Sequence, residues 1–308
     1  VLALVGAETL LGREIRDVFS DSTLAPKFHL IAAREEDTGA VTEQGGEPAL
    51  LTPLDADGLK SAQVIFLAGP AAANLQALEL AAGSKTALID LTGALEDRPE
   101  ARLRAPDLEP PDPLSVPGSL YVIAHPAAIA LAMFFDRLAK RHKISRSVAH
   151  IFEPASERGQ SGLDELQKQT VSLLSFRPLS KTVYDAQASF NLLARYGEDA
   201  PASLEEIEAR IDRHLATLLS RGSHAPMPSL RLVQAPVFHG YSFSVWVEFE
   251  ENPGAVVLSE ALASAQIEVR GTDDEPPTNV GVAGQRGLVA DNLRLSAENA
   301  VAVAKQLL

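Results

Sequence analysis

The first third of the chain alternates short apolar runs with helical patterns. The runs lie at residues 2–6, 28–34, 62–69, 86–93 and 119–124. Strands that are apolar on both faces are typical of parallel sheets that helices cover on each side. The alternation therefore predicts an α/β fold built on a Rossmann-like parallel sheet.

The pattern changes from about residue 144. Residues 242–251 alternate strictly between apolar and polar, which predicts an antiparallel strand with two different faces. Trp246 lies on the polar face and is the best candidate for an interface. Ser203 and Glu206 predict a capping box at the start of the clearest helix. Helices are predicted at residues 161–174, 203–222 and 291–308.

Composition narrows the classes of partner. The formal net charge of −14 repels phosphate backbones, so we expect no nucleic-acid partner. No apolar run reaches the roughly 18 residues that a membrane span needs, so we expect no membrane partner. The first residues, VLALVG, predict an apolar strand without a basic region or cleavage site. We therefore expect no signal peptide and a cytoplasmic protein.

Two residue counts bear on the chemistry. The sequence has no cysteine, which excludes disulfides, thiolate metal sites and a cysteine nucleophile within it. Its seven histidines are scattered without the HxxxH or HxH spacing of metal ligands, so we expect no metal.

The turn after the first apolar run reads GAETLLG and is the candidate nucleotide loop. A dinucleotide site needs glycine at the turn, at the closest approach to the pyrophosphate and at the contact between helix and strand. Gly6 and Gly12 fill the outer two roles, but Thr9 fills the middle one, where its side chain crowds the phosphate. The loop predicts binding of NAD or NADP that Thr9 weakens. The candidate cofactor-binding residues are Gly6, Thr9, Leu10, Leu11, Gly12 and Arg34.

The second apolar run ends in Arg34, Glu35 and Glu36. Arg34 can hold the 2′-phosphate of NADP, but the two carboxylates oppose that charge. A carboxylate at this place more often binds the ribose 2′-hydroxyl of NAD, so the residues favour NAD slightly over NADP. The alternative that remains open is that all three are solvated surface charges.

Residues 122–134, VIAHPAAIALAMF, predict a strand, then His125 and Pro126, then a helix. A helix N-terminus at the end of a strand stabilises negative charge and therefore suits a nucleophile. Ala127 and Ala128 occupy that place and supply no reactive group.

In this order the motifs resemble those of the aspartate-semialdehyde dehydrogenase family, over nearly the whole chain. LALVGAETLLG resembles the family's nucleotide loop, and VIAHPAAIAL resembles its catalytic turn. The further matches are IDLTGAL, ERGQSGLDEL, SFNLLARYG, QAPVFHGYS and DNLRLSAENAVAVAKQL. The chain most resembles the catalytically degenerate Usg-type paralogues. The family reduces an acyl phosphate to an aldehyde through a cysteine thioester, with NADPH as the hydride donor, in aspartate-family amino-acid biosynthesis.

The resemblance implies two domains and a homodimer. The first is a Rossmann-like NAD(P)-binding domain at residues 1–127, completed by a C-terminal helix at residues 288–308. The second is an α+β dimerisation and catalytic domain at residues 128–287, with a mostly antiparallel sheet. The resemblance also implies that the protein binds a dinucleotide or another small molecule.

Almost every functional position of the family departs from its pattern in this sequence. The resemblance places the catalytic cysteine on Ala128 and the catalytic histidine on Tyr241. It places the glutamine that orients the thioester on Glu153 and the substrate-binding arginine on Gln234. The phosphate-binding arginine falls on Glu96. The resemblance therefore implies that the family's own reaction is lost.

Two hypotheses follow. In the first, the chain is a homologue without semialdehyde dehydrogenase activity that acts as a scaffold or regulator. In the second, it is a nicotinamide-dependent oxidoreductase with thiol-free chemistry, in which His125 and Tyr241 are the acid–base groups. Each residue also has an alternative, purely structural role. His125 can cap the turn before proline, and Tyr241 can fill the volume that an active site would otherwise occupy. We expect Glu153 to form a salt bridge with Arg158 or Arg98, and Asp90 to cap the turn that follows it.

Overall fold

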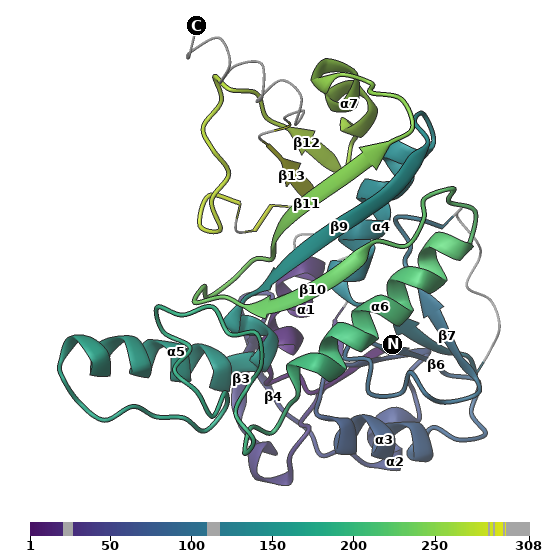
Figure 1. Cartoon of the computed structure of the whole chain (residues 1–308). Helices are drawn as coiled ribbons and strands as arrows, with labels where there is room; N and C mark the ends of the chain where they lie inside the picture. Colours follow the sequence, from purple (N-terminus) through teal and green to yellow (C-terminus); the bar gives the residue numbers. More distant parts are fainter. Residues whose placement is uncertain (21–26, 110–117, 283, 286, 292, 294–308) are drawn as a thin grey trace, which may run out of the picture. The chain divides into compact units, whose positions relative to one another are not determined.

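The computed structural model describes residues 1–20, 27–109, 118–282, 284, 285, 287–291 and 293 (Figure 1). The chain divides into two compact units, Val1–His125 and Pro126–Leu308. Within the described residues, no helix is both long and apolar enough to cross a membrane. The predicted helix at residues 291–308 lies almost wholly outside the described residues.

The first unit is built on a parallel sheet of six strands in the order β2-β1-β5-β6-β8-β7. All five strand pairings in this sheet are parallel, which confirms the α/β prediction. The strands are β1 (Leu2–Val5), β2 (Phe28–Ile31), β5 (Val64–Leu67), β6 (Ala87–Asp90), β7 (Ala101–Arg104) and β8 (Leu120–Ile123). The helices are α1 (Leu10–Ser20), α2 (Ala56–Leu59) and α3 (Ala71–Leu80).

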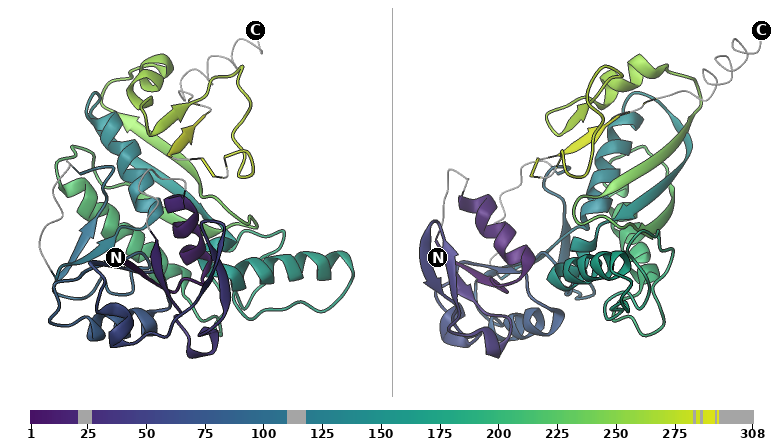
Figure 2. Two further views of the ribbon diagram at one scale, coloured as in Figure 1. Left: turned by 180° about the vertical axis from the view of Figure 1, so that it is seen from behind. Right: turned by 90° about the vertical axis from the view of Figure 1, so that its left-hand side faces the viewer.

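Both faces of this sheet are buried, as the apolar runs predict. Ala3 and Val5 pack into a cluster with α3, whereas Leu4 packs on the opposite face with side chains of α1. Figures 1 and 2 show α1 and α3 on opposite faces of the sheet. Successive side chains of a strand point to opposite faces, so only runs without polar interruptions can serve such a sheet.

A hairpin of β3 (Val41–Gln44) and β4 (Glu47–Leu50) also belongs to this unit and is absent from the sequence predictions. Gly45 and Gly46 form its two-residue turn, with φ of +60° and +81°. A pair of glycines with positive φ is the turn that joins tightly paired strands. The sequence QGGE was therefore a signal for this hairpin.

The second unit contains a three-stranded sheet in the order β10-β9-β11. The long central strand, β9 (Ile144–Glu153), pairs antiparallel with β11 (Ser242–Phe249) and parallel with β10 (Ser229–Gln234). The sheet is therefore mixed, because one of its two pairings is parallel. The other elements are α4 (Pro126–Ala139), α5 (Gly159–Leu174), α6 (Leu204–Ser220), α7 (Ala255–Leu262), β12 (Ile267–Val269) and β13 (Leu288–Ala290).

Helices α4 and α6 pack against each other, and they contact β9 and β10 respectively. One face of α6 carries an apolar stripe that is buried; its members are Ile207, Ile211, Leu215 and Leu218. Ser203 caps this helix, because its Oγ accepts a hydrogen bond from the Glu206 amide at 3.3 Å. Among the described residues the Glu206 side chain accepts no hydrogen bond from the Ser203 amide, so only half of the predicted capping box forms. The Ser203 hydroxyl instead also donates to Glu205 at 3.0 Å.

Candidate functional site

The candidate nucleotide loop lies where the strand order of the first sheet reverses, between β1 and β5. Gly6 follows β1 with φ of +79°, and a Cβ there would lie 2.5 Å from the amide nitrogen of Gly69. A Cβ on Gly12 would collide with the carbonyl oxygen of Gly6. The two glycines therefore allow the close approach of helix and strands, and this reversal point is where open α/β sheets bind ligands.

Thr9 holds this loop together from within. Its hydroxyl lies 2.8 Å from the Gly6 carbonyl oxygen and 3.0 Å from that of Ala68. The same oxygen accepts a hydrogen bond from the Gly12 amide at 3.0 Å, which makes Thr9 the cap of α1. One amide at the N-terminus of α1 is thus already used by the protein. Leu10 and Leu11 form the first turn of the helix.

Carboxylates surround the end of β2. The Arg34 guanidinium forms ion pairs with Glu36 at 3.0 Å and with Asp37 at 2.8 Å, and these pairs raise the pKa of Arg34. On the loop side, Glu8 accepts a hydrogen bond from the Ala33 amide at 2.9 Å. Glu8 and Asp37 are residues that the sequence reasoning missed. Their charge leaves little positive potential here for a 2′-phosphate.

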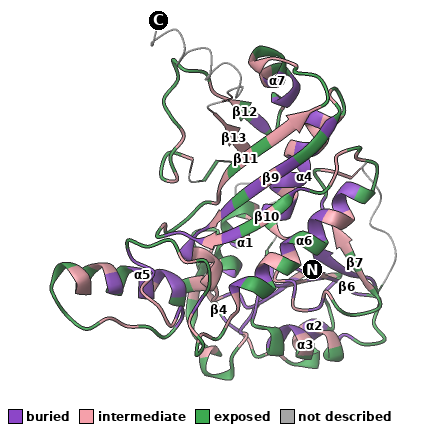
Figure 3. Ribbon diagram, in the orientation of Figure 1, coloured by how far each residue is buried: buried purple, intermediate pink, exposed green. Residues whose placement is uncertain are grey.

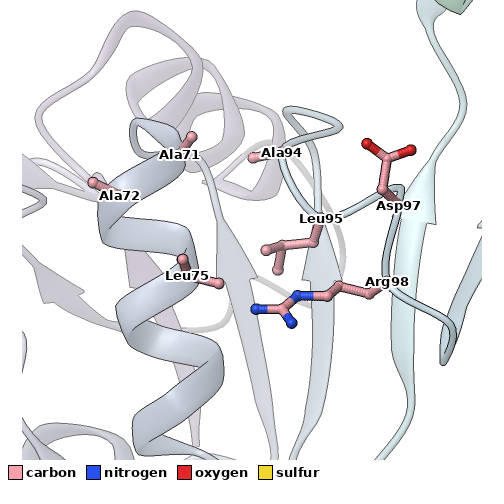
Figure 4. Close-up of a pocket in the computed structure, with 7 residues that line it drawn as sticks. All are labelled: Ala71, Ala72, Leu75, Ala94, Leu95, Asp97 and Arg98. Atoms are coloured by element: carbon pink, nitrogen blue, oxygen red, sulfur yellow. The ribbon is translucent and has the colours of Figure 1, made fainter.

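A pocket of about 340 Å³ lies between α3 and the turn that follows β6 (Figure 4). Its walls are mainly apolar, with Asp97 and Arg98 among the lining residues; the others are Ala71, Ala72, Leu75, Ala94 and Leu95. Asp90 fixes this turn, because its carboxylate accepts hydrogen bonds from the Thr92 and Leu95 amides at 2.9 and 2.8 Å. The expectation that Asp90 caps the turn is confirmed. Glu96 lies half-buried in the same turn.

The two alanines lie in the first turn of α4, directly after Pro126. The side chains of Ala127 and Ala128 are completely buried. His125 precedes the helix, is half-buried and ends the first unit. Helix α4 thus begins where the sequence predicts a helix, and Ala127 and Ala128 supply no reactive side chain in its first turn.

Three of the predicted positions meet in the second unit, around Arg158. Glu153 ends β9 and is completely buried; its Oε1 accepts a hydrogen bond from Arg158 Nη2 at 2.8 Å. The predicted salt bridge is therefore formed with Arg158. The second oxygen of Glu153 has no hydrogen-bond partner among the described residues. Burial raises the pKa of Glu153 to about 7, against the opposing effect of Arg158.

Tyr241 reaches this cluster from the loop before β11. Its hydroxyl interacts electrostatically with the Glu157 carboxylate. Burial raises the pKa of Tyr241 well above its usual value, and the nearby Glu157 and Glu153 carboxylates raise it further. Burial also raises the pKa of Glu157. Tyr241 is thus held as a neutral hydrogen-bond donor near neutral pH.

The side chain of Gln234 is fully engaged inside the protein. Its Nε2 donates to the carbonyl oxygens of Glu153 and Ala235, both at 2.9 Å. Its Oε1 accepts a hydrogen bond from the Tyr196 hydroxyl at 2.7 Å. The amide therefore joins β10 to the end of β9 and leaves no polar hydrogen for a ligand. The sequence did not identify Tyr196 as its partner, although SFNLLARYG contains it.

These side chains allow proton exchange and hydrogen bonding, not nucleophilic attack by a thiol. Glu153 has the acid strength that general acid–base catalysis near neutral pH requires. Arg158 supplies a positive charge that interacts with two carboxylates, those of Glu153 and Glu157. Within the described part of the chain, no group of three His, Cys, Asp or Glu residues could hold a metal ion.

Comparison with known proteins identifies relatives along nearly the whole chain. The USG-1 protein homolog of Pseudomonas aeruginosa is 28% identical over 301 residues, which cover 92% of this chain and 84% of that protein. The structure of a probable aspartate-semialdehyde dehydrogenase from Pseudomonas aeruginosa is similar with a TM-score of 0.80 and 25% identity. That alignment covers 99% of this chain and 97% of the other.

A more distant structure shares the fold alone. Aspartate semialdehyde dehydrogenase with NADP from Candida albicans has a TM-score of 0.60 at 12% identity, covering 90% of this chain and 83% of that one. The family model described as "Semialdehyde dehydrogenase, dimerisation domain" matches residues 137–304, which is more than half of the chain. The chain therefore belongs to the semialdehyde dehydrogenase family.

Proposed function

We propose that this chain is a homodimeric member of the semialdehyde dehydrogenase family that does not catalyse the family's thiol-dependent reaction. The observation that carries the proposal is Ala128, buried in the first turn of α4 where the resemblance puts the cysteine. An alanine methyl group cannot form a thioester. The sequence supplies no other cysteine to take that part.

Two further positions support the loss. Gln234 replaces an arginine that would bind an anionic substrate, and its amide is spent on Glu153, Ala235 and Tyr196. Glu153 replaces a neutral glutamine and adds a negative charge as it ionises. An anionic substrate would therefore meet a weaker attraction and a new repulsion. Several positions thus differ from the family pattern in ways that each weaken catalysis or substrate binding. This supports a loss of the reaction more strongly than a single substitution would.

We further propose that the first unit binds a nicotinamide dinucleotide and the second mediates dimerisation. Gly6 and Gly12 fit the close approach of a dinucleotide, whereas Thr9 already uses the Gly12 amide, so binding is weakened. Arg34 is neutralised by Glu36 and Asp37, which favours NAD over NADP. When bound, a nicotinamide supplies hydride transfer; the residues named here bind and orient it.

An assay of the oxidation of aspartate semialdehyde with NADP and inorganic phosphate tests the loss. We expect no turnover above a blank from the natural chain. Ala128→Cys restores the thiol and should remain inactive alone, because Gln234 and Tyr241 still lack the charge and the base. The matched test is Ala128→Cys combined with Gln234→Arg and Tyr241→His. Clear turnover by the unmodified chain would overturn the proposal.

One observation favours a second candidate, a nicotinamide-dependent oxidoreductase without a thiol. The pKa of Glu153 lies near 7, which suits proton transfer to or from a bound aldehyde or alcohol. Tyr241 would donate a hydrogen bond there, since its raised pKa keeps the hydroxyl protonated and leaves no phenolate to act as a base. A panel of small aldehydes with NADH or NADPH tests this candidate. Any turnover should be lost in both Glu153→Gln and Tyr241→Phe, and its persistence in both would end the idea.

A further inference from the structure

The carboxylate of Glu8 lies at the end of β2, although Glu8 belongs to the candidate nucleotide loop that follows β1. The Gly6 and Ala7 amides both donate to the Ile31 carbonyl oxygen, at 3.0 and 3.3 Å. These bonds fix the loop against the last residue of β2. Glu8 comes next in the chain, and its Oε1 accepts a hydrogen bond from the Ala33 amide at 2.9 Å. The loop thus brings a carboxylate to the end of the neighbouring strand.

The end of β2 has no acid of its own. Residues 32–33, which follow the strand directly, are both alanine, and a methyl group accepts no hydrogen bond. In dinucleotide-binding folds, a carboxylate beyond this strand accepts a hydrogen bond from the ribose of the adenosine half. Further along the chain, Glu36 and Asp37 are held in ion pairs by Arg34. The Glu8 carboxylate therefore supplies the acceptor that the two alanines do not.

One oxygen of this carboxylate still lacks a donor. Glu8 Oε2 is buried and has no hydrogen-bond partner in the part of the chain that the structure describes. Such an atom is costly, and it calls for a donor from outside, because a carboxylate can only accept. Figure 3 shows that buried residues follow the strands of this unit, whereas its loops carry exposed ones. Glu8 is half-buried, and a side chain beside Oε2 must move as a ligand enters.

The chemistry of the carboxylate decides which ribose it accepts. A 2′-hydroxyl can donate a hydrogen bond to Glu8 Oε2. A 2′-phosphate is anionic near neutral pH and offers mainly acceptors, so the carboxylate repels it. The guanidinium of Arg34, at the same strand end, is already engaged by two other carboxylates. The ligand group that fits this place is therefore an adenosine ribose with an unmodified 2′-hydroxyl.

We propose that Glu8 binds the adenosine ribose of the dinucleotide and selects against a 2′-phosphate. This inference rests on the dinucleotide binding of the proposed function and names a residue that determines its specificity. The acid comes from the loop after β1 and reaches the place where such folds use an acid that follows β2. The charge that selects the ligand is thus built into the same loop whose glycines approach it.

Calorimetric titration of the full chain with NAD, and with NAD that lacks the 2′-hydroxyl of its adenosine, tests this contact. Loss of the hydroxyl should raise the dissociation constant for the natural chain about tenfold, as loss of a hydrogen bond to a charged group does. Glu8→Gln keeps a carbonyl oxygen for the Ala33 amide, so its melting temperature should stay close to that of the natural chain. This variant should bind NAD about tenfold more weakly, discriminate less against NADP and become nearly indifferent to the missing hydroxyl.

Two variants with the same change of charge are the matched controls. Glu14→Gln alters an exposed carboxylate of α1, and Glu35→Gln alters an exposed carboxylate that follows β2. Both should bind NAD as the natural chain does and remain sensitive to the missing hydroxyl.

The outcomes separate this inference from the proposed function. An equal response to the missing hydroxyl in the natural chain and in Glu8→Gln would overturn the role of Glu8 and leave NAD binding standing. Loss of NAD affinity in Glu35→Gln, with Glu8→Gln unchanged, would overturn it too and assign the ribose to Glu35. A natural chain that gives no heat with NAD would overturn both the inference and the dinucleotide binding that it rests on.

Discussion

At the scale of single residues, the buried carboxyl of Glu153 has the clearest consequence for stability. The pKa of this group lies at about 7 in the folded protein, against an ordinary value of 4.5. Below pH 4.5 both folded and unfolded states hold the proton. As the pH rises towards 7, the unfolded state releases it first, so the folded state loses stability. The full difference is on the order of 3 kcal/mol.

Glu153→Gln should remove most of this pH dependence. The amide stays neutral at every pH and keeps a carbonyl oxygen for Arg158. We expect the free energy of unfolding to fall more steeply between about pH 5 and about pH 8 in the natural chain than in the variant. Urea titrations at several pH values measure this slope. Glu248→Gln, which alters an exposed carboxylate paired with Arg146, is the control and should follow the natural chain. Equal slopes in all three proteins would contradict the prediction.

At the scale of elements, α5 acts as the support for the long loop that follows it. Glu165 is buried in this helix and accepts hydrogen bonds from the Thr182 and Val183 amides at 2.7 and 2.9 Å. One turn further on, Gln169 accepts from the Ala188 amide at 2.8 Å and donates to the Ser180 carbonyl oxygen at 2.7 Å. The loop lacks helix or strand over most of its length, so these two side chains replace the backbone bonds that would otherwise order it.

Glu165→Ala should therefore release the loop. The variant leaves buried amides without acceptors, at a cost of about 2–4 kcal/mol. We expect trypsin to cleave after Lys181 much faster in this variant, under conditions where the rest of the chain stays folded. Gln167→Ala changes an exposed residue of the same helix and is the matched control. Cleavage at the same rate in both variants would show that the loop does not depend on Glu165.

The sequence predicts elements whose signal is local. The five apolar runs became strands of one parallel sheet, and the Ile207–Leu218 stripe is buried, because periodicity alone decides which face is covered. β7 was not predicted, since ARLR alternates charge with apolar residues and takes its place by pairing at the edge of the sheet, next to β8. The parallel pairing of β9 with β10 was also missed, because register between strands far apart in the chain leaves no local pattern.

The candidate site shows the same limit. The pairing of Glu153 with Arg158 was predictable, because the two residues are five positions apart and a buried carboxylate needs a cation. The contact of Gln234 with Tyr196 and the support of Thr9 by Ala68 were not predictable, because each joins residues that are distant in sequence. A resemblance to a family suggests which family position a residue occupies, whereas only the fold gives the contacts that this residue makes.

At the scale of the whole molecule, net charge and local charge act together on the choice of dinucleotide. The chain carries a net charge of −14. NADP has one more phosphate than NAD and is therefore repelled more strongly. Near the end of β2, Arg34 is the residue that could offset this, and Glu36 and Asp37 already hold it at 3.0 and 2.8 Å. The net charge of the chain and the local charge around Arg34 therefore both predict that any dinucleotide binding favours NAD.

Calorimetric titration of the purified chain with NAD and NADP in separate runs tests this preference. We expect the natural chain to bind NAD more tightly. Glu36→Ala combined with Asp37→Ala frees Arg34 and should shift the ratio of the two affinities towards NADP by about tenfold, equivalent to about 1.4 kcal/mol. Glu35→Ala removes a carboxylate of the same turn that forms no ion pair with Arg34 among the described residues, so it should change the ratio less.

Ionic strength separates the two contributions of charge. Added salt screens the long-range repulsion by the whole chain, because the Debye length falls to about 8 Å at physiological ionic strength. The difference between NAD and NADP should therefore narrow with salt in the natural chain, while the effect of the double variant persists through its direct contact. A ratio that is indifferent to both salt and the double variant would show that charge does not set the preference. No heat with either nucleotide would mean that the first unit retains the Rossmann architecture without its ligand.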